Sequence, residues 1–205
     1  SGWDDINATT IGGILRGSGS HWVTGLMDDV AIWKRALSAD EVASLNSVGI
    51  PAGITWDFND GLPEGSEVAG HAEHSGDEGV DGSGALVLTR NLASQLGGWL
   101  SPEIGTVSAF TIDFDIYIAD GTATQADGLS MAISDDLEPV EAFSENGRGS
   151  KLIVAFDNWD NGGGEAPAID IVWGGVLVAT EAMGAQGAST LDTDGWWPVH
   201  IELTS

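Results

Sequence analysis

The chain has 205 residues, of which 42% are hydrophobic, and its 32 Asp and Glu against 6 Lys and Arg give a formal net charge of -26. The apolar content suffices for a substantial buried core, so we expect a folded chain, and the negative charge repels nucleic acids and anionic membranes while attracting cations. The chain has no cysteine, which excludes disulfides and thiolate metal sites, and no apolar stretch near the roughly 18 residues that cross a bilayer, so we expect no membrane insertion. The acidity also fits a solvated surface adapted to a salty medium, and both explanations stay open.

A single short helix is predicted near residues 39–46. Ser38 and Glu41 fit a capping box, in which Ser38 caps the helix start and Glu41 bonds back to it, and Gly49 offers a stop. Pro51 then begins a new pattern. We therefore expect a domain boundary near residues 49–52.

The segment before this boundary holds two aspartates, an alternating strand, the sequence Ala-Leu-Ser and an acidic helix start, all within residues 25–42. This pattern resembles the closing strand and helix of laminin-G-like jelly-roll domains. Residues 1–50 are too few to form a sandwich core of their own. Either they end a domain that began before residue 1, or their strands complete the sandwich of residues 51–205, and we expect a longer parent polypeptide in both cases.

From residue 51 onward the apolar residues repeat with a period of two. Residues 110–118 alternate Phe and Ile with polar side chains, which is typical of a strand with one buried face. Further strands are predicted at 54–58, 85–89, 129–134, 151–156, 168–173, 176–180 and 197–203. The 30 glycines and several Asp-Gly pairs supply turns between them. The sequence therefore predicts an all-β, antiparallel β-sandwich of jelly-roll type.

An acidic, glycine-rich loop follows the predicted strand 151–156. Residues 157–165 read Asp-Asn-Trp-Asp-Asn-Gly-Gly-Gly-Glu, which places carboxylate and amide oxygens and one tryptophan in a short turn. Ca2+ takes six to eight oxygen ligands, so this composition suits a calcium loop. A turn of such residues is also common without any ion, and composition alone leaves both interpretations open.

Two separated motifs make residues 51–205 resemble an L-type (legume-like) lectin domain of the concanavalin A-like lectin and glucanase superfamily. Residues 126–133 match the family's Ala-Asp-Gly-Leu strand. Residues 154–161 match its metal loop of Phe-Asp, any residue, an aromatic residue, any residue and Asn. The resemblance implies a concanavalin A-like jelly roll, with further strands expected after Ser205.

The resemblance implies one calcium ion in the loop. Asp157 and Asn161 match the family's calcium ligands, Trp159 would contribute its backbone carbonyl, and Glu165 would replace a later acidic ligand. Asp160 is a spare candidate. Six to eight oxygens would be completed by water.

The resemblance also implies a sugar site beside the ion. Asp127 would accept hydrogen bonds from two sugar hydroxyls and would follow a cis peptide after Ala126. The Trp159 indole would stack on the apolar face of the sugar, and the Asn161 amide would donate to a hydroxyl. Gly149 stands where the family places a glycine backbone donor.

Two alanines depart from the legume pattern. Ala155 stands where legume lectins carry a glutamate, and Ala168 stands about where they carry a histidine, and both of those residues bind a second, transition-metal ion. Without a carboxylate and an imidazole we expect no transition metal. A single calcium ion is the consistent arrangement.

We therefore expect a calcium-dependent carbohydrate-binding module of a secreted or cell-surface multidomain protein, without catalysis. Its partners would be glycans or polysaccharides, and other surface proteins or copies of itself. The alternative is an adhesive repeat module that calcium only rigidifies. A glycoside hydrolase is a weaker alternative, because 168–173 lacks the glutamates that such enzymes place on this strand. His71 and His74 have a spacing that could chelate a metal, although we favour a solvated loop there.

Overall fold

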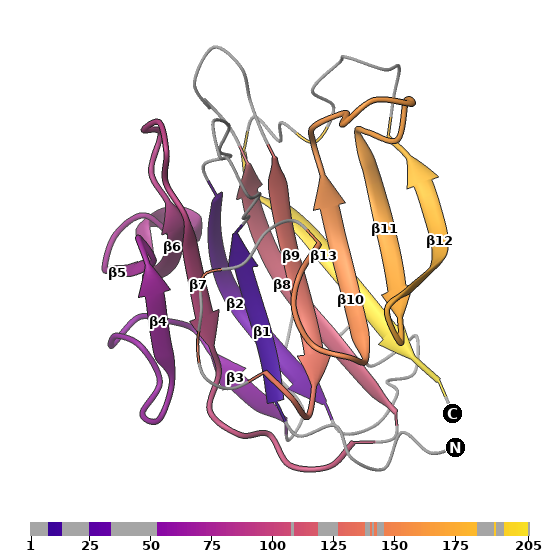
Figure 1. Ribbon diagram of the computed structural model, residues 1–205. Helices are drawn as coiled ribbons and strands as arrows, with labels where there is room; N and C mark the ends of the chain where they lie inside the picture. The colour runs from indigo at the N-terminus through magenta and orange to yellow at the C-terminus, as the bar shows by residue number, and fades with distance from the viewer. Residues whose placement is uncertain are drawn as a thin grey trace.

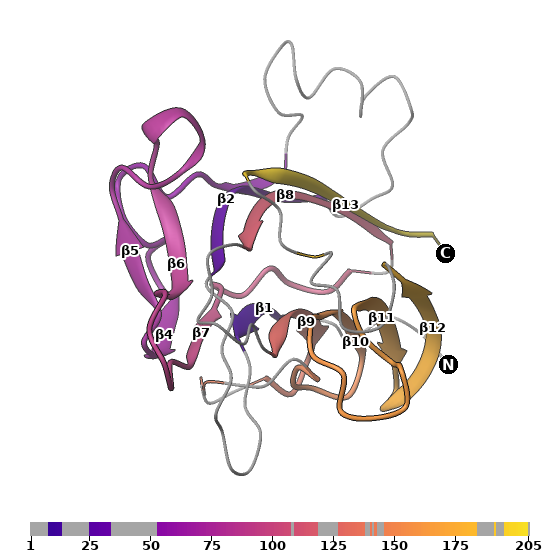
Figure 2. The same ribbon diagram turned by 90° about the horizontal axis from the view of Figure 1, so that it is seen from above.

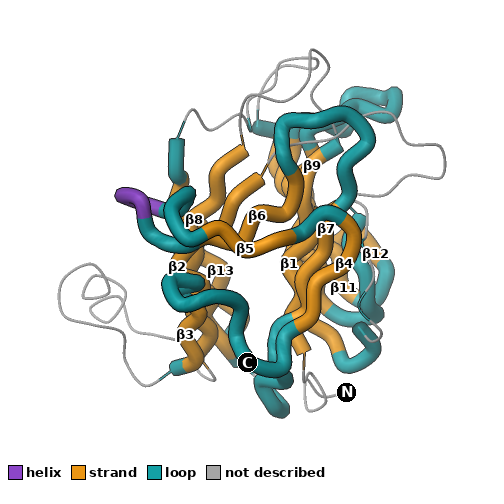
Figure 3. The backbone as a smooth tube through the Cα atoms, turned by 90° about the vertical axis from the view of Figure 1, so that its left-hand side faces the viewer, coloured by secondary structure: helices purple, strands orange, loops and turns teal. Residues whose placement is uncertain are grey.

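The computed structural model describes residues 8–13, 25–33, 53–107, 109–118, 127–137, 140, 142, 146–183, 191 and 195–204. These residues form an antiparallel β-sandwich, as predicted, with two sheets stacked face to face (Figures 1 and 3). Within these ranges no helix is long and apolar enough to cross a bilayer. The predicted helix near 39–46 and the boundary near 49–52 fall on residues outside these ranges.

The larger sheet has seven strands, and every neighbouring pair is antiparallel. Its order across the sheet is β12 (Val176–Ala182), β11 (Ala168–Trp173), β10 (Leu152–Asp157), β9 (Gly128–Ser134), β1 (Ala8–Gly13), β7 (Gly97–Leu100) and β4 (Glu67–Gly70).

The smaller sheet has six strands. Its order is β13 (Trp197–Leu203), β8 (Phe110–Ile118), β2 (Gly25–Trp33), β6 (Ala85–Thr89) and β5 (Glu73–Ser75), with β3 (Ile54–Trp56) also paired to β2. A 3-10 turn, η1 (Val80–Gly82), lies between β5 and β6.

Strands from the first segment lie inside both sheets. β1 pairs with β9 on one side and with β7 on the other, and β2 lies between β8 and the two strands β6 and β3. Figure 2 shows both strands between strands from the later sequence. The described strands of residues 1–50 are therefore hydrogen-bonded into sheets built mostly from residues beyond 51.

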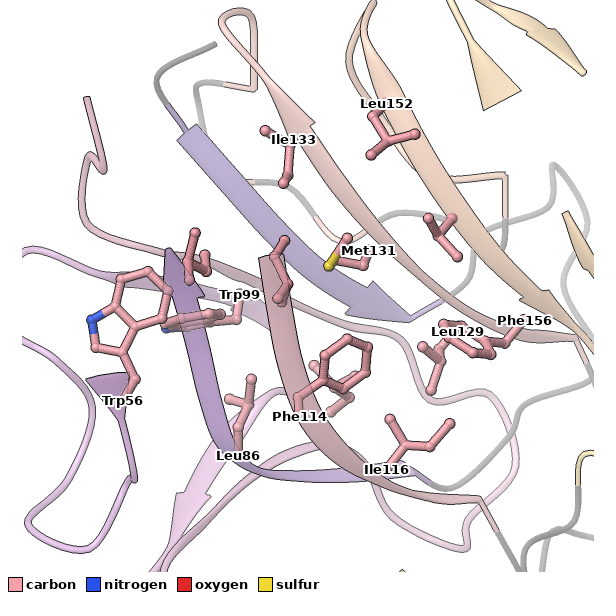
Figure 4. Close-up of a cluster of buried hydrophobic side chains, with 14 of the residues drawn as sticks. Trp56, Leu86, Trp99, Phe114, Ile116, Leu129, Met131, Ile133, Leu152 and Phe156 are labelled. Atoms are coloured by element: carbon pink, nitrogen blue, oxygen red, sulfur yellow. The ribbon is translucent and has the colours of Figure 1, made fainter. Parts of the chain in front are cut away.

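The core between the sheets is aromatic and aliphatic (Figure 4). Trp99 is fully buried, and its ring meets Trp56 and Phe58 edge to face at centroid distances of 5.2 and 5.5 Å. Such pairs add about 0.5–1.5 kcal/mol beyond the burial of area.

Strand alternation fixes which face carries the candidate site. In β9 the side chains of Leu129, Met131 and Ile133 belong to the core, and in β10 those of Leu152, Val154 and Phe156 do. Because successive side chains point to opposite faces, Ser130, Ala155 and Asp157 lie on the outer face of the larger sheet.

Candidate metal and carbohydrate site

Asp127 and the acidic loop lie side by side at one end of the larger sheet. β9 begins at Gly128 and β10 ends at Asp157, and these two residues are partners in the antiparallel register. The backbone N–H of Asn158 donates to the carbonyl oxygen of Asp127 over 2.7 Å. The loop that joins β10 to β11 therefore starts next to Asp127, at the upper edge of the sheet in Figure 1.

Gly128 is what permits this close approach. Its φ of +146° is unfavourable for other residues, and a Cβ atom added there would lie 2.0 Å from the carbonyl oxygen of Phe156. The glycine of the Ala-Asp-Gly motif is thus required by the backbone, and it sets the position of Asp127 relative to β10.

Two carboxyl groups are buried at these neighbouring strand ends. Asp127 is 4% exposed and Asp157 is 6% exposed. Asp157 Oδ1 accepts a hydrogen bond from the N–H of Trp159 at 3.0 Å. Burial removes solvation from an ionised carboxylate, and hydrogen-bond donors or a cation beside it offset that cost.

The remainder of the loop is closed by its own carboxylates. Asp160 Oδ1 accepts hydrogen bonds from the N–H groups of Gly162 and Gly164 at 2.8 and 3.1 Å. Glu165 Oε1 accepts from the N–H of Asn161 at 2.5 Å. These bonds bring residues 161 and 165 together across the turn.

Two of the predicted ligand groups already have a spacing that suits one ion. The side-chain amide of Asn161 donates to the carbonyl oxygen of Trp159 over 3.4 Å. Ca2+ binds its oxygen ligands at ~2.3–2.6 Å, so two oxygens with an O–Ca–O angle of about 90° are about 3.3–3.7 Å apart. A half turn of the amide about its Cβ–Cγ axis exchanges the nitrogen for the oxygen, so the geometry is compatible with a shared ion.

Pairwise contacts link the predicted site residues: Asn158 joins the loop to Asp127, Trp159 bonds to Asp157, and Asn161 bonds to Trp159 and Glu165. The Trp159 side chain is half-buried, and Asn161 and Glu165 are exposed. Ala126, and with it the implied cis peptide before Asp127, falls on a residue that is not described. A cis peptide is present at Ala166–Pro167, where the loop leads into β11.

Gly149 is not brought to this group. A Cβ atom at Gly149 would lie 2.6 Å from Ser134 Cβ and 2.8 Å from Leu137 Cδ2, which places the glycine at the far end of β9 from Asp127. Its neighbour Gly147 packs on Ile153, nearer the middle of the sheet. Gly149 is explained by tight packing at that end, so the predicted backbone contact with a sugar is corrected.

The two alanines adjoin Asp157. Ala168 is the register partner of Asp157. Ala155 lies two residues before Asp157 on the same face of β10, and its register partners are Ser130 in β9 and Asp170 in β11. The two positions to which the resemblance assigns ligands of a second metal therefore both lie beside Asp157, and each carries only a methyl group.

Among the described residues, no three His, Cys, Asp or Glu side chains converge closely enough to hold a metal ion. The predicted calcium set has only two acidic side chains, Asp157 and Glu165, and takes its other ligands from an amide and a carbonyl. His71 Nδ1 lies 3.0 Å from the carbonyl oxygen of Leu96, and His74 Nε2 lies 2.7 Å from that of Phe58. The two histidines therefore contact different backbone segments.

Sequence reasoning assigned no definite role to Asp160 or Asn158. Asn158 is buried between the strand ends, where its N–H reaches Asp127. The signal for Asp160 was an aspartate followed by glycines two and four residues later, a pattern that lets one carboxylate cap two backbone N–H groups.

No protein-family model, curated protein or solved structure matches the chain, and its family therefore stays a prediction.

Proposed function

We propose that this chain is a calcium-dependent carbohydrate-binding module of L-type lectin character. The observation that carries the proposal is the hydrogen bond from Asn158 to the Asp127 carbonyl. It joins two motifs that are far apart in the sequence and that a sugar-binding calcium site needs side by side.

Calcium would be held by Asp157, the Trp159 carbonyl, Asn161 and Glu165, with water completing the shell. The 3.4 Å separation of the Asn161 amide and the Trp159 carbonyl supports this ligand pair. Glu165 Oε1 accepts a hydrogen bond from the backbone N–H of Asn161, and this oxygen would give up that bond to bind the ion. Flexible, oxygen-rich coordination of this kind suits Ca2+ better than Mg2+.

The sugar would lie between Asp127 and the loop. Trp159 offers an indole that is not fully buried, and Asn161 is exposed beside it. One aromatic face and a few polar groups predict weak monovalent binding, with Kd in the range of about 1 μM to 1 mM. Repeated modules or oligomers of a secreted or surface protein would then supply avidity for a polysaccharide.

The test is a glycan array and a calcium titration on three proteins: the wild type, Trp159→Ala and Trp197→Ala. Trp197 is the matched control, since it is 45% exposed on β13 in the other sheet. We expect Trp159→Ala to lose glycan retention and to keep its stabilisation by calcium, because the ligand from residue 159 is a backbone carbonyl. Trp197→Ala should behave as the wild type. Glycan retention that survives chelation would sink the proposal.

A second candidate is a structural or adhesive module that calcium only rigidifies. The burial of Asp127, at 4% exposure, favours this alternative because a sugar needs access to that carboxylate. Calcium would then raise the melting temperature while no glycan is retained by any of the three proteins.

We propose no catalytic activity. The strand that a glycoside hydrolase would use is β11, and its one aspartate, Asp170, has Ala155 and Thr180 as register partners. Retaining hydrolysis needs a second carboxyl group about 5 Å away, and neither partner supplies one.

A further inference from the structure

On one side of the sandwich the larger sheet extends further than the smaller one. Phe114 in β8 meets Phe156 in β10 across the core, so β8 lies over β10. From there the larger sheet continues through β11 to β12, whereas the described part of the smaller sheet continues only to β13. Figures 1 and 2 show β12 and β13 on this same side. By strand count β13 lies over β11, and no described strand of the smaller sheet is left to cover β12.

The face of β12 that points toward the other sheet is apolar and exposed. The core residue Val154 pairs with Ile171, and Ile171 pairs with Ala179 of β12. Trp173, which packs on the core, pairs with Val176. Directly paired residues share a face of a sheet, so Ala179 and Val176 point inward. Nevertheless Ile171 is 39% exposed and Val176 is 63% exposed.

β13 carries an apolar inward face beside a sheet edge. Trp197 pairs with the core residue Ile116, so its indole points inward, and yet it is 45% exposed. β13 is the last described strand of its sheet on this side, and Pro198 fits that position because prolines within sheets occur mainly on edge strands. An edge strand next to an uncovered apolar face is what the addition of a further strand requires.

The outer face of the same edge is acidic. Asp113 and Asp115 of β8 and Glu202 of β13 lie on that face, and the only base that these two strands supply is His200, which contacts Asp113 at 2.6 Å. The whole chain has a formal net charge of -26. A strand added beside β13 would alternate between the two faces, so apolar inward side chains and basic outward ones complement this edge.

We propose that β13 and the inward face of β12 form a docking surface for an extended segment of another polypeptide, in which apolar side chains alternate with Lys or Arg. The segment would lengthen the smaller sheet by one strand and cover Val176 and Trp197. A second copy of this chain fits less well, because both copies would bring the same acidic edge and like charges across an interface oppose binding. The proposal goes beyond calcium and sugar binding and does not depend on either.

The probe is a synthetic peptide of alternating Lys and Val, about eight residues long to match a strand of this kind, with binding measured by calorimetry. One comparison peptide has the same composition in two blocks, and another has Glu in place of Lys. We expect the alternating Lys peptide to bind, less tightly in high salt, and both comparison peptides to bind at least about tenfold more weakly. Absence of binding would overturn the docking surface, and equal binding of the Glu peptide would overturn its basic partner.

The matched variants are Val176→Lys and Leu177→Lys. Leu177 is 55% exposed on the opposite face of β12, so both substitutions add one positive charge at similar exposure on the same strand. Val176→Lys should weaken binding of the alternating Lys peptide about tenfold or more, and Leu177→Lys should stay within about threefold of the wild type. Ala179→Lys, also inward, repeats the test if Val176→Lys does not fold. Equal affinities of the inward and outward variants would contradict the location.

Amide hydrogen exchange tests the added strand itself. The peptide should slow exchange in β13, and protection of β12 alone, or of neither strand, would overturn pairing at β13. Sedimentation of the chain without peptide tests the other occupant. We expect a monomer at this surface, and a dimer that Val176→Lys dissociates while Leu177→Lys does not would make a second copy the occupant and end the proposal. Glycan retention and calcium stabilisation are measured on separate samples, so loss of the proposed function leaves these outcomes unchanged.

Discussion

Phe114 of one sheet and Phe156 of the other meet edge to face, with ring centroids 6.5 Å apart and planes inclined at 82°. Phe156 is followed directly by Asp157, so this contact ties the start of the acidic loop to the core. The position of Asp157 on the outer face is thereby coupled to packing between the two sheets.

Replacing Phe114 by Leu should destabilise the fold by about 1–2 kcal/mol, because the edge-to-face pair is lost and a small cavity remains. Urea unfolding measures the change. Leu92→Ala is the control, since Leu92 is 58% exposed and its truncation should cost no more than about 0.5 kcal/mol. Equal effects in the two variants would show that the aromatic contact contributes nothing of its own.

Gly128→Ala should be far more damaging than an ordinary substitution at positive φ. The new methyl group would lie 2.0 Å from the Phe156 carbonyl oxygen, so β9 and β10 must separate beside Asp127. Gly61→Ala is the matched control, because Gly61 also has positive φ, +120°, but open space around its Cβ position. Strain alone costs about 1–3 kcal/mol, so thermal unfolding should show a clearly larger loss for Gly128→Ala. Similar melting temperatures would contradict the close approach.

Side-chain periodicity made the long strands predictable. β8 alternates apolar and polar residues along its length, and the predicted bounds 85–89, 110–118, 168–173 and 197–203 match β6, β8, β11 and β13. Four strands, β1, β4, β5 and β7, were not predicted. β7 begins with Gly97 and Gly98, which carry no side-chain signal, and Gly97 is needed because a Cβ atom there would lie 1.8 Å from the carbonyl oxygen of Leu88. That reason is non-local, and it cannot be read from a short window of sequence.

The candidate site also has a part that could be predicted from the sequence and a part that could not. Neighbours within the loop, such as Trp159 and Asn161, could be grouped from sequence because their separation along the chain is small. Gly149 was placed by order in the motif alone, and it lies instead where the chain returns to β10 beside Ser134. Loop paths between strands depend on packing, which residue order does not record.

A charge pair beside β6 predicts a pH dependence of stability. Arg90 Nη1 donates to Glu78 at 2.5 Å and Arg90 Nε donates to Glu73 at 2.8 Å. The hydrogen bond from Arg90 lowers the pKa of Glu78 below its usual value. The ionised carboxylate therefore favours the folded state above the unfolded pKa, and this contribution is lost as pH falls through the folded pKa.

Solvent screens this pair, since both side chains are 38% exposed, so Glu78→Gln should cost less than about 1 kcal/mol at pH 7. Urea unfolding at pH 7 and pH 3 should show the difference from wild type shrinking at the lower pH and in high salt. Glu64→Gln, an exposed side chain on a turn, controls for the loss of one charge. A pH-independent difference would rule out the charge pair as its cause.

The pKa of a second carboxyl group, that of Asp136, should depend on a buried hydroxyl, that of Ser134, rather than on a cation. Partial loss of solvation opposes ionisation of the Asp136 carboxyl group, although the residue is exposed. The Ser134 hydroxyl and the N–H of Ser150 donate to this carboxylate, and these bonds hold the pKa of Asp136 below its usual value. Ser134→Ala should therefore raise this pKa, which an NMR titration measures directly. The pKa of Asp136 is lower in the folded than in the unfolded state, so its contribution to stability is present above the unfolded pKa and is lost as pH falls through the folded pKa. Because Asp136 is exposed, this contribution stays below about 1 kcal/mol. Ser66→Ala removes a hydroxyl that donates to the neutral carbonyl of Pro63 at 2.7 Å, so its cost should not change with pH. If the two serine variants lost stability with the same pH profile, the bond from Ser134 to Asp136 would not be what keeps that carboxyl group ionised.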